Sequence, residues 1–212
     1  MRYNPHEIIE NKKYRHVFTL AYNDIIPFVL TYIKKYTLPL FIFICLLLLS
    51  FVWLLIIYTG IAGNYPFISI AGHTLAGLIL IPVLLVIPHE FLHIIPYYLA
   101  GARKISIGAE WKQYYFFVTA DKFPVAAPVF ITVALSPFVI INIALILLGM
   151  SFSPLWQYTF ISSLFAHITM CAGDLALINF YYLNRNKKII TWDNVSTREA
   201  YFYEYIPDAE TK

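Results

Sequence analysis

The sequence His89-Glu90-Phe91-Leu92-His93 places two histidines four residues apart, with a glutamate directly after the first. In a helix, residues four apart lie one turn apart on the same face, so the two imidazoles can bind a single metal ion. Zn²⁺ is the usual metal for such a pair, and the adjacent glutamate can take a proton from water at that metal. This H-E-x-x-H spacing is typical of zinc peptidases, and it predicts a Zn²⁺ site at His89 and His93 with Glu90 as general base.

A catalytic zinc site has three protein ligands and one position open to water, so a third ligand is needed. Within its long apolar segments the chain has only two carboxylates, Glu90 and Asp174. An ionisable group inside a bilayer costs a few kcal/mol, which a metal ion would offset. At about 1.5 Å per residue, His93, His89 and Asp174 lie about 12, 18 and 16 Å above the ends of their segments. This shared depth predicts Asp174 as the third ligand.

The composition indicates a membrane protein. Of the 212 residues, 60% are hydrophobic and 13% are charged, whereas soluble domains carry roughly 25% charged residues. The small net charge of +3 gives no reason to expect a nucleic-acid partner. The two cysteines, Cys45 and Cys171, both lie in apolar segments, which excludes a disulfide framework. Cys171 is close to Asp174 in sequence, but burial as a small apolar residue is its simpler role.

Four apolar segments are long enough to cross a bilayer, namely residues 37–59, 73–100, 125–148 and 155–183. We therefore expect an all-α membrane protein with four transmembrane helices in one domain, residues 37–184. Residues 1–36 form an N-terminal cytoplasmic or interfacial segment in this interpretation, and residues 185–212 form a cytoplasmic tail. Residues 60–72, which contain three glycines and a proline, are predicted to be a loop.

Short stretches outside these segments have the composition of strands and of one interfacial helix. Residues 16–20 predict a strand and residues 25–35 a helix. We expect residues 105–108 and 114–119 to form a hairpin that turns near Lys112-Gln113. In the tail, we expect residues 189–192 and 201–203 to form a second hairpin. The strand at 114–119 is apolar on both faces, so it is a candidate for contact with a substrate near the metal.

The distribution of basic residues predicts the orientation. The N-terminal segment, the loop at 101–122 and the tail contain lysine and arginine, whereas residues 60–72 and 149–154 have no charge. Basic loops stay on the cytoplasmic side of a membrane. Four spans with both termini in the cytoplasm satisfy this rule at every loop.

Taken together, the motif and the later aspartate resemble the site-2 protease type of intramembrane metalloprotease. The size and layout are more similar to the putative zincin peptidase family of small four-span bacterial membrane proteins. The resemblance covers roughly residues 80–185 and includes Pro88, Leu135-Ser136-Pro137 and Gly173-Asp174. It implies that His89, His93 and Asp174 bind zinc and that Glu90 is the general base. Site-2 proteases usually have glycine after the aspartate, whereas Gly173 precedes it here.

Two functions follow as hypotheses. The first is a zinc-dependent metalloprotease in the bacterial cytoplasmic membrane that cleaves membrane or membrane-proximal polypeptides. The alternative is a non-catalytic metal-binding scaffold or carrier. His167, Asn142 and Asn179 are polar residues in the predicted spans that could contact the site, although hydrogen bonding between helices is their more common role. The sequence leaves the oligomeric state open.

Overall fold

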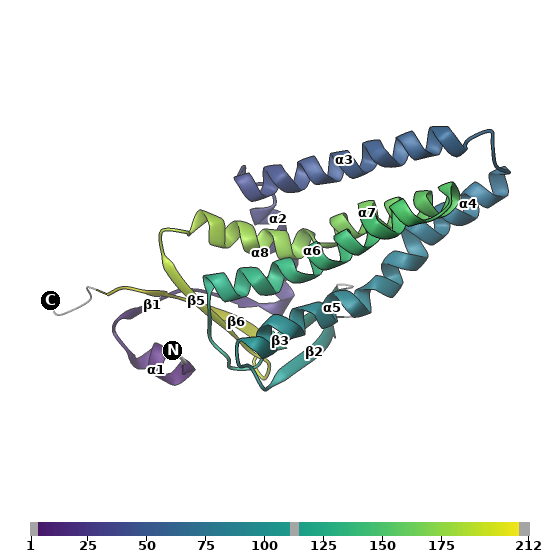
Figure 1. Ribbon diagram of the computed structural model, residues 1–212. Coiled ribbons are helices and arrows are strands. Elements are labelled where there is room, and N and C mark those ends of the chain that lie inside the picture. Colours follow the sequence, from purple (N-terminus) through teal and green to yellow (C-terminus); the bar gives the residue numbers. More distant parts are fainter. Residues whose placement is uncertain (1–3, 111–114, 208–212) are drawn as a thin grey trace.

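Long helices lie side by side in the computed structural model, and a small sheet covers one end of them (Figure 1). The structure describes residues 4–110 and 115–207. The helices are α1 (Pro5–Glu10), α2 (Ile25–Tyr32), α3 (Leu38–Ile61), α4 (Phe67–Leu75), α5 (Ile81–Leu99), α6 (Ala127–Ser151), α7 (Pro154–Met170) and α8 (Ala172–Leu183). The strands are β1 (Tyr14–Ala21), β2 (Ile105–Glu110), β3 (Tyr115–Ala120), β4 (Val125–Ala126), β5 (Lys188–Asn194) and β6 (Glu199–Tyr205).

Three helices are long and apolar enough to cross a membrane: α3, α6 and the continuous helix Phe67–Leu99. The last consists of α4, one π-helical turn at Ala76–Leu80, and α5. The helices α7 and α8 are bent by 47° at a short break, and they make a fourth span if the pair is counted as one. The prediction of a mostly helical protein with membrane-length helices is therefore confirmed, with three or four candidate spans.

The second long helix begins earlier than the sequence predicted. Residues 67–72 are helical, whereas we expected them in a loop. Pro66 stands at the N-cap of α4, where a missing N–H group costs nothing, and Gly72 is tolerated inside the helix. Glycine and proline mark a loop only where the backbone leaves the helix, and here it leaves at residues 62–66.

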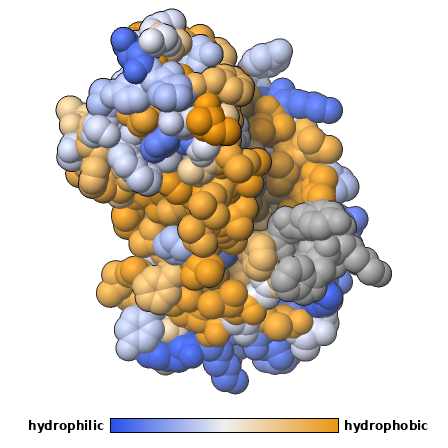
Figure 2. Space-filling view, turned by 90° about the vertical axis from the view of Figure 1, so that its right-hand side faces the viewer, coloured by the Kyte–Doolittle hydropathy of each residue, from blue (hydrophilic) through white to orange (hydrophobic). Residues whose placement is uncertain are grey.

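The helices expose apolar side chains along much of their length. Leu49 and Ile56 on α3 are each 64% exposed, and Val83 on α5 is 63% exposed. The space-filling view shows a broad hydrophobic surface, with hydrophilic residues gathered toward its upper and lower edges (Figure 2). Such a surface is compatible with lipid, because an apolar side chain loses nothing by facing a hydrocarbon environment.

The ends of the described chain pair in one antiparallel sheet of order β1-β6-β5-β4. Aromatic side chains hold its inner face against α2 and α8. The rings of Phe18 and Phe202 stack with centroids 4.3 Å apart, and Phe28 and Phe180 join the same cluster. The strand at 16–20 and the tail hairpin were predicted, but their pairing with each other was not.

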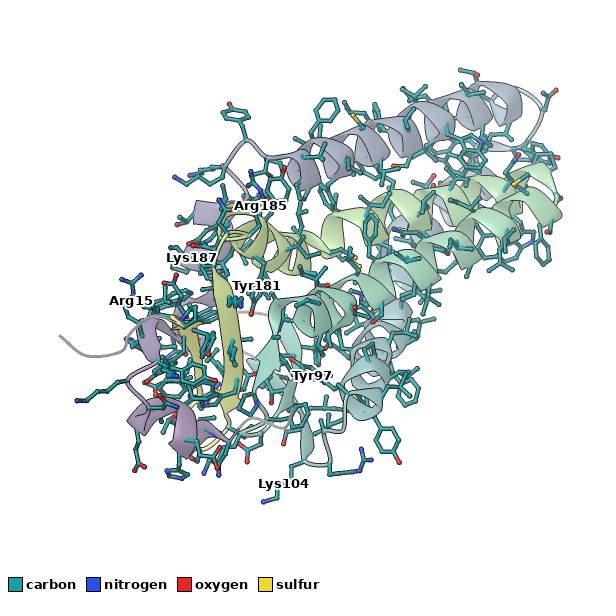
Figure 3. All side chains as sticks on the ribbon, turned by 60° about the vertical axis from the view of Figure 1, so that its left-hand side comes forward. Arg15, Tyr97, Lys104, Tyr181, Arg185 and Lys187 are labelled. Carbon is teal, nitrogen blue, oxygen red and sulfur yellow. The ribbon has the colours of Figure 1, made fainter. Side chains whose placement is uncertain are left out.

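The predicted hairpin at 105–119 is confirmed as β2 and β3, which form a separate two-stranded sheet. Its predicted turn near residues 112–113 lies outside the described residues, as does residue 114. Basic side chains, including Arg15, Lys104, Arg185 and Lys187, lie at the end of the molecule that carries both sheets (Figure 3). The uncharged connections at 62–66 and 152–153 lie at the other end (Figure 1).

Close packing between the π-helical turn and α7 predicts that Gly77→Ala destabilises the protein. A Cβ at Gly77 would lie 2.6 Å from the Thr159 backbone oxygen, which does not move without the helix. Overpacking of this kind costs roughly 1–3 kcal/mol. We expect a lower thermal unfolding midpoint in detergent for Gly77→Ala. The matched variant Gly72→Ala, whose Cβ would meet nothing within 4 Å, should unfold at or above the wild-type midpoint. Equal midpoints for the two variants would contradict this packing.

Candidate metal centre

The helix α5 presents His89 and His93 on one buried face. Each histidine is 8% exposed, and their ring centroids lie 5.0 Å apart. The helix continues through Pro88 and Pro96, so the four-residue spacing gives the one-turn separation that the sequence predicted.

Asp174 reaches the same place from the first turn of α8. Its Oδ2 lies 3.3 Å from His89 Nε2, and its Oδ1 lies 3.6 Å from His93 Nε2. The chain bends just before it, at Cys171, and a carboxylate at the start of a helix is favoured by the free N–H groups and the helix dipole there. The structure thus brings together the three residues that the sequence singled out, with ligand atoms within 4.8 Å of one another.

The orientation of His93 depends on a proline in the neighbouring helix. Pro137 has no N–H group, so the Val133 carbonyl one turn earlier in α6 has no helical donor. That carbonyl instead accepts a hydrogen bond from His93 Nδ1, at 2.9 Å, and Ser136 Oγ lies 2.9 Å from it. Because a carbonyl only accepts, the hydrogen of the neutral His93 ring is on Nδ1, and the Nε2 lone pair points toward Asp174.

A second proline gives the reciprocal contact. Pro96 in α5 leaves the Leu92 carbonyl without its helical donor, and the Ser136 hydroxyl donates to that oxygen at 2.8 Å. Each helix therefore uses a carbonyl released by proline to bind the other. The two contacts fix α5 against α6 at the level of His93.

The side chains in this cluster fit a zinc ion. Two imidazole nitrogens and a carboxylate are ordinary zinc ligands, and facing lone pairs repel unless a cation lies among them. Glu90 supplies a further observation, because its Oε2 atom is buried and has no hydrogen-bond partner among the described residues. A buried unpaired carboxylate oxygen is costly, and a ligand or water at the site would satisfy it.

A cavity of about 380 Å³ opens beside the cluster. It is lined by His89, Glu90, His93 and Asp174, and further by α2, by β3 and by the inner face of the large sheet. Most of that lining is apolar. The cavity is large enough for several side chains of a bound polypeptide.

The other polar residues divide into two groups. His167 Nε2 lies 3.2 Å from His89 Nδ1, and His167 Nδ1 lies 2.8 Å from Asn142 Oδ1. The Cys171 sulfur is 3.8 Å from His167, so a second potential ligand group consists of His89, His167 and Cys171. Asn179 lies elsewhere: it accepts a hydrogen bond from Thr37 and donates to the Tyr32 carbonyl, which ties α8 to the segment before α3. The sequence favoured hydrogen bonding between helices for these polar residues, but it did not reveal that His167 is a neighbour of His89.

The released Val133 carbonyl predicts that Pro137→Ala weakens metal binding. That oxygen accepts the hydrogen bond from His93 Nδ1 and also lies 2.9 Å from Ser136 Oγ, so the backbone N–H group that this substitution introduces would compete with His93 for it. We expect about a 10-fold rise in the dissociation constant for Zn²⁺, measured by competition with a chromophoric chelator. Pro128→Ala is the control. Pro128 lies in the first turn of α6, where a backbone N–H group has no helical acceptor, so this variant should bind zinc like the wild type. An unchanged affinity in Pro137→Ala would contradict the role of this carbonyl.

Asp193 lies on β5 where the sheet borders the cavity, and the Tyr22 hydroxyl donates to it at 3.4 Å. Burial raises the pKa of its carboxyl from 3.8 to about 7, the hydrogen bond from Tyr22 opposes this rise, and the charge of Asp121 adds to it. Between these two pKa values the folded protein binds a proton that the unfolded chain does not, so stability falls as the pH rises through this range.

This pKa predicts that Asp193→Asn raises the thermal unfolding midpoint more at pH 8 than at pH 5, because the amide never bears the buried charge. The measurement is thermal unfolding in detergent at both pH values. Asp24→Asn, which changes an exposed carboxylate, is the control and should shift the midpoint equally at both. An equal shift at the two pH values in Asp193→Asn would rule out the buried charge.

Comparison with known proteins agrees with the resemblance noted in the sequence. No curated protein and no solved structure matches the chain. Residues 82–190 match the family described as putative zincin peptidase, and this range contains α6, α7, α8 and all of α5 except its first residue, with His89, Glu90, His93 and Asp174. It covers more than half of the chain, and the chain belongs to the putative zincin peptidase family.

Proposed function

We propose that the protein is a zinc-dependent, membrane-embedded metalloprotease that hydrolyses peptide bonds of membrane or membrane-proximal polypeptides. His89, His93 and Asp174 would hold the zinc ion, and Glu90 is the general base. The observation that carries this proposal is the convergence of two imidazole nitrogens and one carboxylate beside an unpaired glutamate oxygen, all on one cavity. Family membership supports peptidase chemistry with zinc.

When bound there, zinc supplies Lewis-acid polarisation of a carbonyl and makes water more acidic. The protein supplies the proton transfers. Glu90 lies next to His89 on α5 and its Oε2 faces no hydrogen-bond donor among the described residues, so it is ready to accept a proton from the attacking water. The same carboxyl then donates that proton to the leaving amine.

The cavity suggests how a polypeptide approaches Glu90. Residues 116–119 of β3 line it, and β3 pairs with β2 on one side only within the described sheets. An extended segment can bind a strand at the edge of a sheet through its backbone N–H and C=O groups. Peptide bonds in a membrane helix are shielded and hydrogen-bonded, so we propose that a substrate helix unwinds before it binds along β3.

We further propose four membrane spans, with α7 and α8 together as the fourth, and both termini on the cytoplasmic side of a bacterial cytoplasmic membrane. The gathering of basic side chains at the sheet end supports this orientation (Figure 3). The metal centre lies between α5 and α8, and the cavity extends from it to the sheet. Cleavage would therefore take place in the cytoplasmic half of the membrane.

Glu90→Gln tests the catalytic role, because glutamine keeps the shape of the side chain and cannot accept the proton. We expect it to reduce cleavage of a fluorogenic unfolded polypeptide by about 10²-fold or more while zinc remains bound at one per chain. Comparison of membrane proteins in cells with wild-type and Glu90→Gln protein should reveal the polypeptides that accumulate uncut. Unreduced cleavage by Glu90→Gln would remove this residue from the mechanism.

Substitution of the ligands separates the protease from the scaffold or carrier. His89→Ala and Asp174→Ala should each lose zinc and activity together, whereas His6→Ala, at an exposed histidine in α1, should lose neither. Zinc bound at one per chain, lost in both ligand variants, with no cleavage by the wild type of soluble or membrane-embedded polypeptides, would support the scaffold instead.

A further inference from the structure

Two buried polar residues, His167 and Asn142, lie on the side of His89 away from Asp174. Neither has a described hydrogen bond or ion pair with Asp174. His167 on α7 is fully buried, and Asn142 on α6 is 8% exposed. They form a chain with His89, through hydrogen-bond distances of 2.8 Å from Asn142 Oδ1 to His167 Nδ1 and 3.2 Å from His167 Nε2 to His89 Nδ1. Three helices, α6, α7 and α5, each contribute one member.

The direction of this chain follows from what each atom can do. An amide oxygen only accepts hydrogen bonds, so the hydrogen on the neutral His167 ring is on Nδ1. His167 Nε2 then has a lone pair and accepts a hydrogen bond from His89 Nδ1. With its hydrogen on Nδ1, His89 has a free lone pair on Nε2, the atom that lies 3.3 Å from Asp174.

The opposite direction would disable the site. If the amide of Asn142 were rotated, its NH₂ group would donate to His167 Nδ1, and the His167 hydrogen would be on Nε2. His89 Nδ1 would then accept that hydrogen, and its Nε2 would bear the N–H group toward Asp174. A nitrogen with an attached hydrogen does not bind a metal, so the orientation of one amide decides whether His89 is a ligand.

We propose that Asn142 and His167 are positioning residues that fix the tautomer of His89 and hold its Nε2 lone pair toward the metal. This inference rests on the proposed metal centre. In this proposal His167 does for His89 what the Val133 carbonyl does for His93. In each case an acceptor behind the ring holds the hydrogen on Nδ1. Partners of this kind orient metal-binding histidines and raise their basicity.

A second metal ion at His89, His167 and Cys171 is the competing explanation of the same contacts. Both nitrogens of His89 would then bind metal, and the ring would have to lose both hydrogens. The Cys171 sulfur is 3.8 Å from His167 Nε2, which is within reach of a shared ion, so stoichiometry decides between the two. If Asn142 and His167 instead fix the tautomer of His89 through this chain of hydrogen bonds (the tautomer chain), each protein molecule binds one zinc ion. Cys171→Ala should then leave the dissociation constant for Zn²⁺ unchanged.

The experiment measures the dissociation constant for Zn²⁺ in two pairs of variants. Asn142→Leu and His167→Phe remove the acceptors, and we expect each to raise the dissociation constant about 10–100-fold. Asn142→Asp and His167→Gln keep an acceptor in a side chain of similar size, and we expect them to bind zinc within a few-fold of the wild type. A merely structural role predicts the reverse order at position 142, since leucine packs in an apolar helix interface more easily than a buried carboxylate.

The tautomer of His167 is read directly in the zinc-loaded wild type, independently of any variant that fails to fold. In protein labelled with ¹⁵N at histidine, the His167 signals, assigned by their loss in His167→Gln, should show a hydrogen on Nδ1 and none on Nε2. His73→Phe is the control, because His73 makes a partly buried contact to Thr159 between α4 and α7, at 2.7 Å, away from the centre. It should leave zinc affinity unchanged.

The outcomes separate this inference from the metal centre itself. A wild type that binds no zinc, or one whose affinity is the same in His93→Ala, overturns both. Tight zinc binding that needs His89 and His93 but is equal in Asn142→Leu, Asn142→Asp and the wild type overturns the tautomer chain alone. A hydrogen on His167 Nε2, or two zinc ions per chain, also overturns it.

Discussion

The structure depends on a set of acceptor atoms that face one another inside a layer of helices. His89 Nε2 lies 3.3 Å from Asp174 Oδ2 and His93 Nε2 lies 3.6 Å from Asp174 Oδ1, and the Val133 carbonyl holds the His93 hydrogen on the far side of its ring. In a poorly solvated interior such an arrangement is unfavourable without a cation among these atoms. The helices therefore bring together a site whose own electrostatics call for a metal ion.

Proline makes this arrangement possible without leaving buried carbonyls unpaired. In a lipid environment each backbone group needs a partner within the protein, and a proline takes one donor away. Here Pro137 releases the carbonyl that orients His93, and Pro96 releases the carbonyl that binds Ser136 of the neighbouring helix. Two of the helix carbonyls around the metal site are thus paired because proline released them. Among the described residues, Glu90 Oε2 and Thr119 Oγ1 are buried oxygens of the cavity lining that have no hydrogen-bond partner.

The sequence predicted what depends on local pattern. Helical periodicity placed His89 and His93 on one face, and apolar length placed Asp174 at their depth; the structure brings all three together. The sequence did not predict contacts that depend on packing between distant segments. Examples are the contact of His167 with His89, 78 residues apart, and the pairing of β1 with β6. The break at Cys171 was missed because the residues around it are apolar like the helices that it joins. Depth along an assumed straight helix was still informative, since Asp174 lies just after the break.

X-ray absorption spectroscopy at the zinc edge of the purified, zinc-loaded protein tests the central claim most directly. The account predicts one zinc ion per chain with nitrogen and oxygen neighbours at about 2.0–2.2 Å and no sulfur. In Asp174→Ala this signal should disappear or lose an oxygen neighbour. A sulfur neighbour at about 2.3 Å would place the metal at Cys171, and a spectrum unchanged by Asp174→Ala would contradict the account.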